Sequence, residues 1–307
     1  MQASELMFST TLKQLESSLS VQLVAGNHLR VFETDESSSS AFSEMNEMDF
    51  SQAPVSSDGQ VVGVIDREDT DRGALVAHWM KPLSASHLIS SQTSLREVIR
   101  ILASDKRRYR LILTGSDVTG IVTRSDLQKL PVRLLAFSYV THLETLFTEL
   151  ILSESSADEW VDYLRDFDSS LGGFAQNMLG PLIGTKAVED LYKKQQNFAH
   201  KDVVPPLVEV LEFSQKWYVV CRALDFGEKF AADMAGIQRY LRNPVAHSRN
   251  YVSSDLQLEQ LNRRLEICEE WIEVLTDSVI GATPVSDSVD PDIRIQQWED
   301  SLSWPKS

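Results

Sequence analysis

The sequence predicts an α+β protein, with an N-terminal α/β module followed by an all-helical bundle. Short runs rich in β-branched residues alternate with helical runs over residues 1–130. One motif in these runs occurs twice, which indicates a duplicated α/β unit. After Pro131 the strand signals fade and long amphipathic helices follow. We therefore expect an α/β module at 1–130, a helical domain at 131–280, and a linker with a C-terminal tail at 281–307.

The composition is that of a globular protein with room for two cores. The chain has 307 residues, of which 42% are hydrophobic and 24% are charged. No apolar run is long enough for a membrane span, and Glu5 interrupts the place where a secretory signal needs an apolar core. Cys221 and Cys268 have no CxxC partner. We expect both to be reduced core thiols in a cytoplasmic protein without a membrane segment.

The formal net charge of −16 is unevenly spread. Residues 1–130 carry −4 and residues 131–307 carry −12. The negative electrostatic potential of so acidic a protein repels phosphate, which argues against nonspecific binding to nucleic acid. Recognition of phosphate must then come from local basic pockets. The segment RYLRNPVAHSR at 239–249 stands out, because no acid occurs between Asp233 and Asp255.

The first part is expected to hold strands bounded by turn residues, with a helix before each strand pair. QVVGVID (60–66), RLILTG (110–115) and TGIVT (119–123) are β-rich runs flanked by Gly, Asp and Ser. SLREVIRILASDKR (94–107) carries its apolar residues on one helical face, and SSSAFSEMNEMDF (38–50) is the helix of the first copy.

The recurring motif is GVIDRED at 63–69, echoed by GIVTRSD at 120–126 after an offset of 57 residues. The glycine of such a motif lets the backbone approach a ligand closely. The hydroxyl of Thr123 and the first amides of the following helix can bind a phosphate. Asp126 can accept hydrogen bonds from both hydroxyls of a ribose. The plainer alternative is a helix N-cap formed by Thr123 or Ser125.

Over roughly residues 20–130 the chain resembles the CBS-domain family, whose paired copies form a nucleotide-binding module. The second copy, residues 87–127, is the better match. The resemblance implies that Gly120, Thr123 and Asp126 hold an adenine nucleotide, with Thr123 at a phosphate and Asp126 at the ribose. This regulatory ligand would be AMP, ADP, ATP or a related signalling nucleotide.

The same resemblance implies that the base lies against Ile89 and the strand at 109–111. In the first copy Asp66 stands where Thr123 stands in the second, and a carboxylate there repels a phosphate. Asp69 keeps the ribose-binding position of the first copy. We therefore expect one functional nucleotide site, in the second copy, while the first holds an uncharged adenosine moiety or stays empty.

The basic segment KRRYR at 106–110 lies near the ligand edge in the layout of the family. It can neutralise a polyphosphate, or it can be a solvated basic helix end that the helix dipole favours. The residues alone leave both alternatives open.

The second part is expected to consist of amphipathic helices. Capping boxes that begin at Ser156 and Ser254 place two helix starts. The last helix has an apolar stripe at a spacing of three to four residues, which is either bundle core, the alternative we favour, or a dimer seam. The helices are expected at 132–152, 156–167, 171–198, 204–224, 227–243 and 254–280.

A C-terminal tail follows this last helix. The segment 281–291 is rich in turn-forming residues and is expected to be a linker. Beyond it, Ile295, Trp298 and Leu302 share one helical face, which we expect to dock onto the body of the protein.

The segment 239–249 combines Arg242, Asn243 and His247 around a proline. Five positions on a regular helix put the arginine and histidine side chains ~140° apart. Pro244 lacks an amide and disfavours the α region for Asn243. We therefore expect a kink, or a helix restarted with Asn243 as its N-cap, and either can bring Arg242 and His247 together.

An arginine–histidine pair can cleave RNA without a metal. A neutral imidazole removes the proton of a ribose 2′-OH or protonates the leaving 5′-oxygen, and a guanidinium stabilises the charge of the scissile phosphate. Asn243 can orient the phosphate or the histidine. A symmetric dimer would bring two such pairs into one cleft. The other histidines have no metal-ligand spacing, so we expect no metal: His28, His78, His87, His142 and His200.

Over roughly residues 133–280, the Arg-Asn-x-x-x-His motif late in a helical domain resembles the HEPN superfamily. The resemblance implies a homodimer or higher homo-oligomer with a composite active site and Arg242, Asn243 and His247 as its catalytic set. It implies RNA as the substrate, with transfer RNA as one candidate, and products with 2′,3′-cyclic phosphate ends. Members of the family serve in toxin and phage-defence systems, and some of them are non-catalytic.

Together these inferences predict an adenine-nucleotide-regulated, metal-independent endoribonuclease that acts as a dimer. A helix that begins near Pro131 would transmit the effect of the nucleotide. Two alternatives stay open. One is a non-catalytic protein for nucleotide sensing, dimerisation and partner binding, and the other is a hydrolase of a signalling nucleotide.

Overall fold

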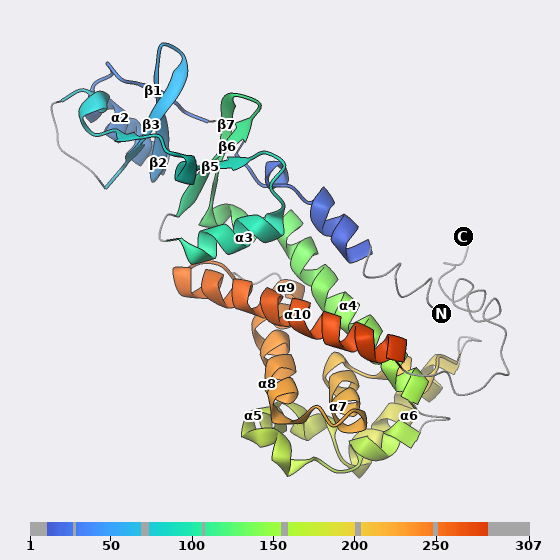
Figure 1. Ribbon diagram of the computed structural model, residues 1–307. Coiled ribbons are helices and arrows are strands. Elements are labelled where there is room, and N and C mark those ends of the chain that lie inside the picture. The colour runs from blue at the N-terminus through green and yellow to red at the C-terminus, as the bar shows by residue number, and fades with distance from the viewer. Residues whose placement is uncertain are drawn as a thin grey trace. The chain divides into compact units, whose positions relative to one another are not determined.

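The computed structural model describes residues 11–26, 29–68, 74–105, 108–154, 159–199, 204–247 and 251–281 (Figure 1). The chain divides into two compact units. The first, which we call the strand unit, consists of Lys13–Phe137 and Pro244–Arg263. The second, which we call the helical unit, consists of the described residues among 11–12, 138–243 and 264–281. The long helices α4 (Leu130–Glu154) and α10 (Asp255–Gly281) each contribute residues to both units.

The strand unit is built from two copies of one motif, and the predicted repeat is confirmed. The offset of 57 residues found in the sequence holds at both ends of the helix and of the two main strands of each copy. The first copy contains α2 (Ser38–Glu47), β2 (Gln52–Ser57) and β3 (Gln60–Asp66). The second contains α3 (Leu95–Ser104), β6 (Tyr109–Thr114) and β7 (Asp117–Thr123).

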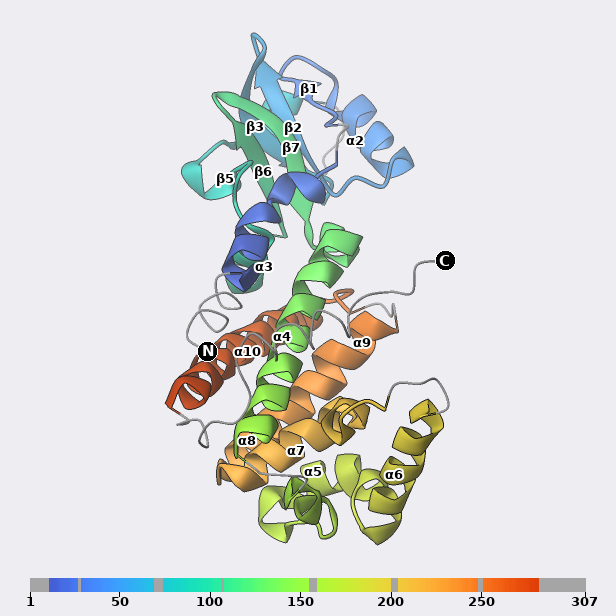
Figure 2. The same cartoon turned by 90° about the vertical axis from the view of Figure 1, so that its right-hand side faces the viewer.

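Each copy forms its own small sheet (Figure 2). In the first, β1 (Phe32–Glu33) runs parallel to β2, and β3 lies antiparallel between β2 and β4 (Lys81–Pro82). In the second, β5 (Leu88–Ser90) runs parallel to β6, which pairs antiparallel with β7. The two hairpins share a register: Gln52 lies opposite Asp66 as Tyr109 lies opposite Thr123. Both copies therefore end their hairpin at the position of the repeated motif.

The hairpin turns follow from glycine and aspartate in left-handed backbone conformations. The first turn holds Asp58 with φ 51° and Gly59 with φ 75°, and the second begins with Gly115 at φ 63°. Such values suit the tight two-residue turns that match the twist of paired strands. Strand β2 escaped the sequence analysis, because Pro54 and three serines or glutamines in QAPVSS weaken the β signal.

Each copy packs its apolar strand and helix residues into a core. Phe32, Ala41, Met45, Val55 and Ile65 are fully buried in the first copy. Val64 of the first copy packs with Tyr109 and Leu111 of the second, so the two sheets share one apolar layer. Burial of this layer is what holds the copies together.

Helices dominate the second half of the chain, and the predicted α+β class is confirmed. The predicted helices near 132–152 and 254–280 correspond to α4 and α10. The helix predicted at 156–167 is wrong: the described part of that stretch is a 3₁₀ turn, Glu159–Leu164. The predicted start at Ser156 lies outside the described residues.

Three further predicted helices have different bounds in the structure. The long helix predicted at 171–198 divides into α5 (Gly172–Leu179) and α6 (Thr185–Ala199), because a 3₁₀ turn with Pro181 near its start interrupts it. The helix predicted from 204 begins only with α7 (Phe213–Ala223), after a 3₁₀ turn at Leu207–Val210. The helix predicted at 227–243 is α8 (Gly227–Ile237), extended by a π-helical turn described below.

The apolar stripe of α10 lies in the core of the single chain. Leu258, Leu261, Leu265, Cys268 and Leu275 are all buried without a second chain. The core alternative is therefore confirmed for this stripe. The predicted linker beyond 281 and the docking residues Ile295, Trp298 and Leu302 lie outside the described residues.

Both cysteines are free and buried, as the sequence predicted. Burial raises the pKa of Cys221 to about 11, so its thiol stays protonated and unreactive at neutral pH. Within the described ranges, no helix combines the length and the apolar character needed to cross a lipid bilayer.

Candidate functional site

Thr123 and Asp126 meet at the end of strand β7, where a 3₁₀ turn, Arg124–Gln128, begins. The backbone N–H of Thr123 donates to Asp126 Oδ2 at 2.7 Å, and its hydroxyl donates to the same oxygen at 2.9 Å. The two residues form a capping box, because the Thr123 side chain in turn accepts from the backbone of Asp126. The N-cap alternative raised by the sequence is thus present in the structure, with Thr123 as the cap.

The second oxygen of Asp126 is held by a lysine. Lys129 Nζ lies 2.7 Å from Asp126 Oδ1, and it also donates to the carbonyl oxygen of Val24. The Asp126 side chain is 15% exposed. Both carboxylate oxygens of Asp126 therefore already accept from protein donors. The hydroxyls of a ribose could bind Asp126 only by displacing Lys129 or by sharing these oxygens with its present donors.

Gly120 and Ile89 lie in the buried layer behind this strand end. Ile89 of β5 pairs with Ile112 of β6, which in turn pairs with Gly120 of β7. A Cβ built on Gly120 would lie 3.4 Å from Ile112 Cδ1 and 3.7 Å from the carbonyl oxygen of Gly26. Leu111, one of the predicted walls for a base, is completely buried. A base can therefore reach only the edges of this layer unless the core opens.

The first copy uses its equivalent residues for structure. Asp66 accepts hydrogen bonds from Gln52 Nε2 and from the backbone N–H of Glu68, both at 3.2 Å. A Cβ built on Gly63 would lie 2.6 Å from the carbonyl oxygen of Lys81, so this glycine is needed for the close approach of β4. The predicted ribose-binding residue Asp69 lies outside the described residues.

The basic segment KRRYR divides into residues with different roles. Helix α3 ends at Ser104 with Asp105 as its C-cap, so the segment begins directly after the helix end. Arg110 is 5% exposed and pairs at 2.7 Å with Asp105, whose side chain is 34% exposed, so only the arginine is buried. Arg108 is exposed and pairs with Asp255 at 3.5 Å. Lys106 and Arg107 lie outside the described residues.

The segment that leads into α10 is attached to the second copy within the strand unit. The hydroxyl of Tyr251 donates to the carbonyl oxygen of Leu127 at 2.9 Å, and burial raises the pKa of Tyr251 to about 12. Arg124, the residue after Thr123, pairs with Asp255. These contacts could not be predicted from the sequence, because no local pattern links residues more than 120 positions apart.

Arg242 lies at the end of a π-helical turn, Gln238–Arg242, which continues α8. The N–H of Asn243 donates to the carbonyl oxygen of Gln238, five residues earlier, as a π turn requires. Asn243 has φ −65° and ψ −46°, which is ordinary helical backbone, and a further turn, Asn243–Ala246, follows. The predicted exclusion of Asn243 from the α region, and its predicted role as an N-cap, are therefore wrong.

The physical reason lies in the wider turn. In a regular α-helix the ring of Pro244 would collide with the carbonyl group of Tyr240. A π turn adds one residue to the backbone loop and moves that carbonyl group aside. The helix can then pass through the proline without a restart. Such π turns recur at functional sites in helical proteins.

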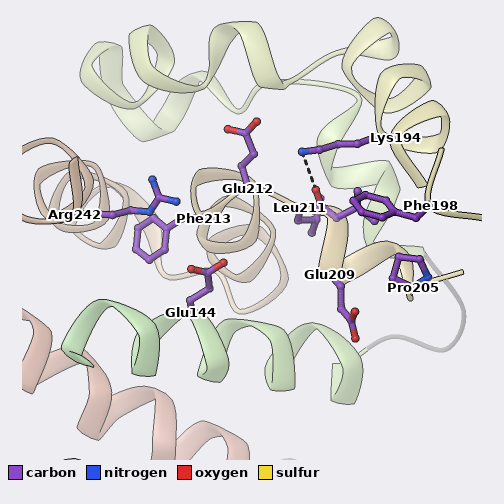
Figure 3. Close-up of a pocket in the computed structure, with 10 residues that line it drawn as sticks. Glu144, Lys194, Phe198, Pro205, Glu209, Leu211, Glu212, Phe213 and Arg242 are labelled. Carbon is purple, nitrogen blue, oxygen red and sulfur yellow. Dashed lines mark hydrogen bonds between the residues drawn. The ribbon is translucent and has the colours of Figure 1, made fainter. Parts of the chain in front are cut away.

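The Arg242 side chain lies at the rim of a cavity of about 660 Å³ in the helical unit (Figure 3). Its guanidinium carbon is 5.6 Å from the centre of the Phe213 ring, within the range of a cation–π contact. Lys194 and Phe198 come from α6, and Glu144 comes from α4. The cavity thus combines aromatic and apolar walls with charged groups of both signs.

Lys216 reduces the negative charge of this cavity. Its ammonium group lies 3.1 Å from Glu144 Oε1, and its side chain is only 9% exposed. Glu212, a second carboxylate of the lining, caps the first amides of α7. These two carboxylates are therefore partly compensated, whereas Glu209 adds a third carboxylate to the lining.

His247 is the last described residue of its segment and is exposed. Arg242 and Asn243 belong to the helical unit, whereas His247 belongs to the strand unit. The structure therefore places the three predicted catalytic residues next to one another along the chain but does not gather them within one unit. Among the described residues, no group of three or more His, Cys, Asp or Glu side chains is placed to hold a metal ion.

The CBS domain family matches residues 84–133 of this chain. This segment contains β5, α3, β6, β7 and the motif from Gly120 to Asp126. The second copy of the strand unit is therefore similar to a CBS domain. No curated protein matches the chain.

Solved structures similar to this chain include three proteins with CBS domains. CBSX2 from Arabidopsis thaliana, solved in complex with AMP, is 20% identical over 38% of this chain and 98% of its own, with a TM-score of 0.34. Protein TA0289 from Thermoplasma acidophilum is 16% identical over 39% of this chain and 75% of its own, with a TM-score of 0.33. The CBS domain of a bacterial CNNM/CorC-family Mg²⁺ transporter, solved in complex with ATP, is 18% identical over 41% of this chain and 94% of its own, with a TM-score of 0.33.

Proposed function

We propose that the second copy of the strand unit binds an adenine nucleotide and that the bound nucleotide regulates the helical unit. The observation that carries the proposal is the placement of Thr123 and Asp126, side by side at the end of β7, within the segment that matches the CBS domain family. The hydroxyl of Thr123 and the amides of the turn after it supply donors for a phosphate. The carboxylate of Asp126 supplies acceptors for the ribose.

The first copy offers a poorer site, so we propose one nucleotide per chain. Asp66 occupies the register position of Thr123 and would face a phosphate with a negative charge. Asp66 also lacks the hydroxyl with which Thr123 could donate to a phosphate.

Calorimetric titration with AMP, ADP and ATP tests this part of the proposal. We expect the wild type to bind one equivalent, and Asp126→Asn to weaken binding about tenfold or more, because an amide cannot accept from both ribose hydroxyls. Asp66→Asn is the matched control, and binding at the second copy should be unchanged in it. A wild type that binds none of the three nucleotides, or an equal loss in both variants, would contradict the proposal.

We further propose that Arg242, Asn243 and His247 serve a metal-independent endoribonuclease that acts as a dimer. The supporting observation is the π turn, which brings Arg242 to the rim of a cavity while His247 stays accessible to solvent. In this reaction the ribose 2′-oxygen attacks the phosphorus and the P–O5′ bond breaks. The 2′-OH proton passes to one imidazole, and a second protonated imidazole gives a proton to the leaving 5′-oxygen. Arg242 stabilises the charge on the phosphate.

The two-subunit site follows from this proton balance. One neutral and one protonated imidazole are needed, and the proposed catalytic set contains a single histidine per chain. A second copy of the chain related by a two-fold axis supplies the other. RNA, including transfer RNA, is the substrate class, because the 2′-OH is the nucleophile.

Digestion of transfer RNA and of an RNA oligonucleotide in the presence of EDTA, with and without adenine nucleotides, tests this second part. We expect cleavage with 2′,3′-cyclic phosphate ends by the wild type, and a loss of about a hundredfold or more in His247→Ala. His78→Ala, which removes another exposed histidine, should cleave like the wild type. Absence of cleavage under all these conditions would leave the alternative function, a non-catalytic sensor that dimerises and binds a partner protein.

A further inference from the structure

Two arginines flank the end of the β6–β7 hairpin, beside the proposed nucleotide site. Tyr109 and Thr123 are register partners across the two strands. Arg108 comes directly before Tyr109, and Arg124 comes directly after Thr123. The pairing of the strands therefore brings both arginines to the same end of the hairpin as Thr123.

A carboxylate already binds between these two arginines. Asp255, the first residue of α10, is hydrogen-bonded to Arg124 Nη1 and lies 3.5 Å from Arg108 Nη2. The two guanidinium groups can thus converge on one oxyanion. The chemistry that holds a carboxylate between two guanidinium groups also suits a phosphate, which carries more charge and more acceptor oxygens.

We infer that Arg108 and Arg124 bind the outer phosphates of a nucleoside di- or triphosphate, and that Asp255 is the internal competitor that those phosphates displace. This inference rests on the proposed nucleotide site and specifies its regulation. Thr123 and Asp126 would hold the nucleoside and first phosphate. The arginine pair would then distinguish ATP and ADP from AMP, because AMP has no phosphate that extends beyond the hydroxyl of Thr123.

The exposure of the three side chains makes such an exchange feasible. Asp255 is 58% exposed, Arg108 is 62% exposed, and Arg124 is 26% exposed. Ion pairs in such contact with water are weak and screened by salt. By contrast, the Arg110 side chain is only 6% exposed and is already paired with Asp105, so it is poorly accessible to a phosphate.

Displacement of Asp255 would act on a defined part of the chain. Asp255 begins α10, and it lies eight residues after His247 in the sequence. Two other contacts, Tyr251 to Leu127 and Arg96 to Asn262, hold this segment from either side of Asp255. Release of Asp255 would therefore loosen the first turn of α10 without detaching the segment.

The test compares Asp255→Asn with Glu259→Gln, an exposed acid one turn further along the same helix. Calorimetry with pyrophosphate measures phosphate binding by the arginine pair alone, because pyrophosphate has no ribose or base to occupy the nucleoside site. We expect Asp255→Asn to bind pyrophosphate about threefold to tenfold more tightly than the wild type, Glu259→Gln to bind like the wild type, and the gain to shrink at 0.5 M salt. Equal affinities in the two variants would overturn the inference.

A titration with ATP and AMP separates this inference from the proposed nucleotide site. Arg108→Gln with Arg124→Gln should weaken ATP binding about tenfold while AMP binding changes less than threefold. An equal loss for both nucleotides would overturn the role of the arginine pair, even if the nucleotide site itself is confirmed. If neither nucleotide binds the wild type, the proposed site fails, and the pyrophosphate result alone decides whether the arginines bind a phosphate.

Discussion

The buried hydroxyl of Tyr218 in the helical unit has three hydrogen-bond partners, and its removal gives a quantitative prediction. Its side chain is completely buried on α7. The hydroxyl donates to the carbonyl oxygen of Asp166 at 2.8 Å and accepts from the backbone N–H of Asp168 at 2.9 Å. Arg222 Nη1 donates to the same oxygen at 3.1 Å. Tyr218→Phe therefore removes three hydrogen bonds while it keeps the ring.

The expected loss of stability follows from those partners. Each of the two backbone bonds contributes about 1 kcal/mol net, and Arg222 can turn to water at little cost. The stacking of the ring on Phe167, at 5.9 Å between centroids, survives in the phenylalanine variant. We expect the free energy of unfolding of the helical unit to fall by about 2 kcal/mol, which corresponds to a decrease in Tm of about 4–8 °C.

Urea and thermal denaturation followed by far-UV circular dichroism measure this change. Tyr192→Phe is the matched control: its side chain is 39% exposed, and it should change the free energy of unfolding by less than about 0.5 kcal/mol. If the free energies of unfolding of Tyr218→Phe and Tyr192→Phe differ by less than about 0.5 kcal/mol, the hydrogen bonds of Tyr218 to Asp166 and Asp168 do not stabilise the fold as proposed.

Two further predictions concern a buried histidine and a buried glycine. Burial lowers the pKa of His142, whose Nε2 has no hydrogen-bond partner in the described structure. As the pH falls, this histidine is therefore protonated at a higher pH in the unfolded chain than in the folded chain. Stability should therefore fall below the ordinary pKa of histidine by up to about 1.4 kcal/mol per pH unit, and denaturation of His142→Gln at pH 7 and 5 should lack this part of the slope. A Cβ on Gly236 would lie 2.8 Å from Arg264 Cζ, so Gly236→Ala should not give the stabilisation of about 0.5–1 kcal/mol usual in a helix, whereas it should do so in an Arg264→Ala background. An unchanged pH slope, or equal effects of Gly236→Ala in both backgrounds, would contradict these assignments.

Much of the strand unit could be predicted from the sequence, because its signals are local. Strand β3 has the bounds expected from QVVGVID, and the offset of 57 residues reappears in the helices and strands of both copies. Alternating apolar residues and the turn residues Asp58, Gly59 and Gly115 act over a few positions, so they favour strands and hairpins locally. The motif from Gly120 to Asp126 is equally local, and the sequence placed it correctly at a strand end.

Other features depended on contacts between distant parts of the chain. Pro244 predicted a break, yet the helical backbone continues through it by a π turn, and burial of Leu241 and Val245 favours that continuity. The sequence allowed Arg110 to be a phosphate-binding or a solvated cation, but the side chain is buried and pairs with Asp105. In both cases packing outweighed the local preference.

The sequence by itself thus determined the repeated α/β motif, the helical character of the second half and the chemistry of its candidate residues. Only the tertiary structure decided what each charged group faces. Asp255 pairs with Arg124, which lies 131 positions earlier in the chain, and no local sequence pattern predicts this ion pair. The physical reason is that periodicity and turn chemistry act between neighbours in the chain, whereas the partner of a charge depends on which surfaces the folded core brings together.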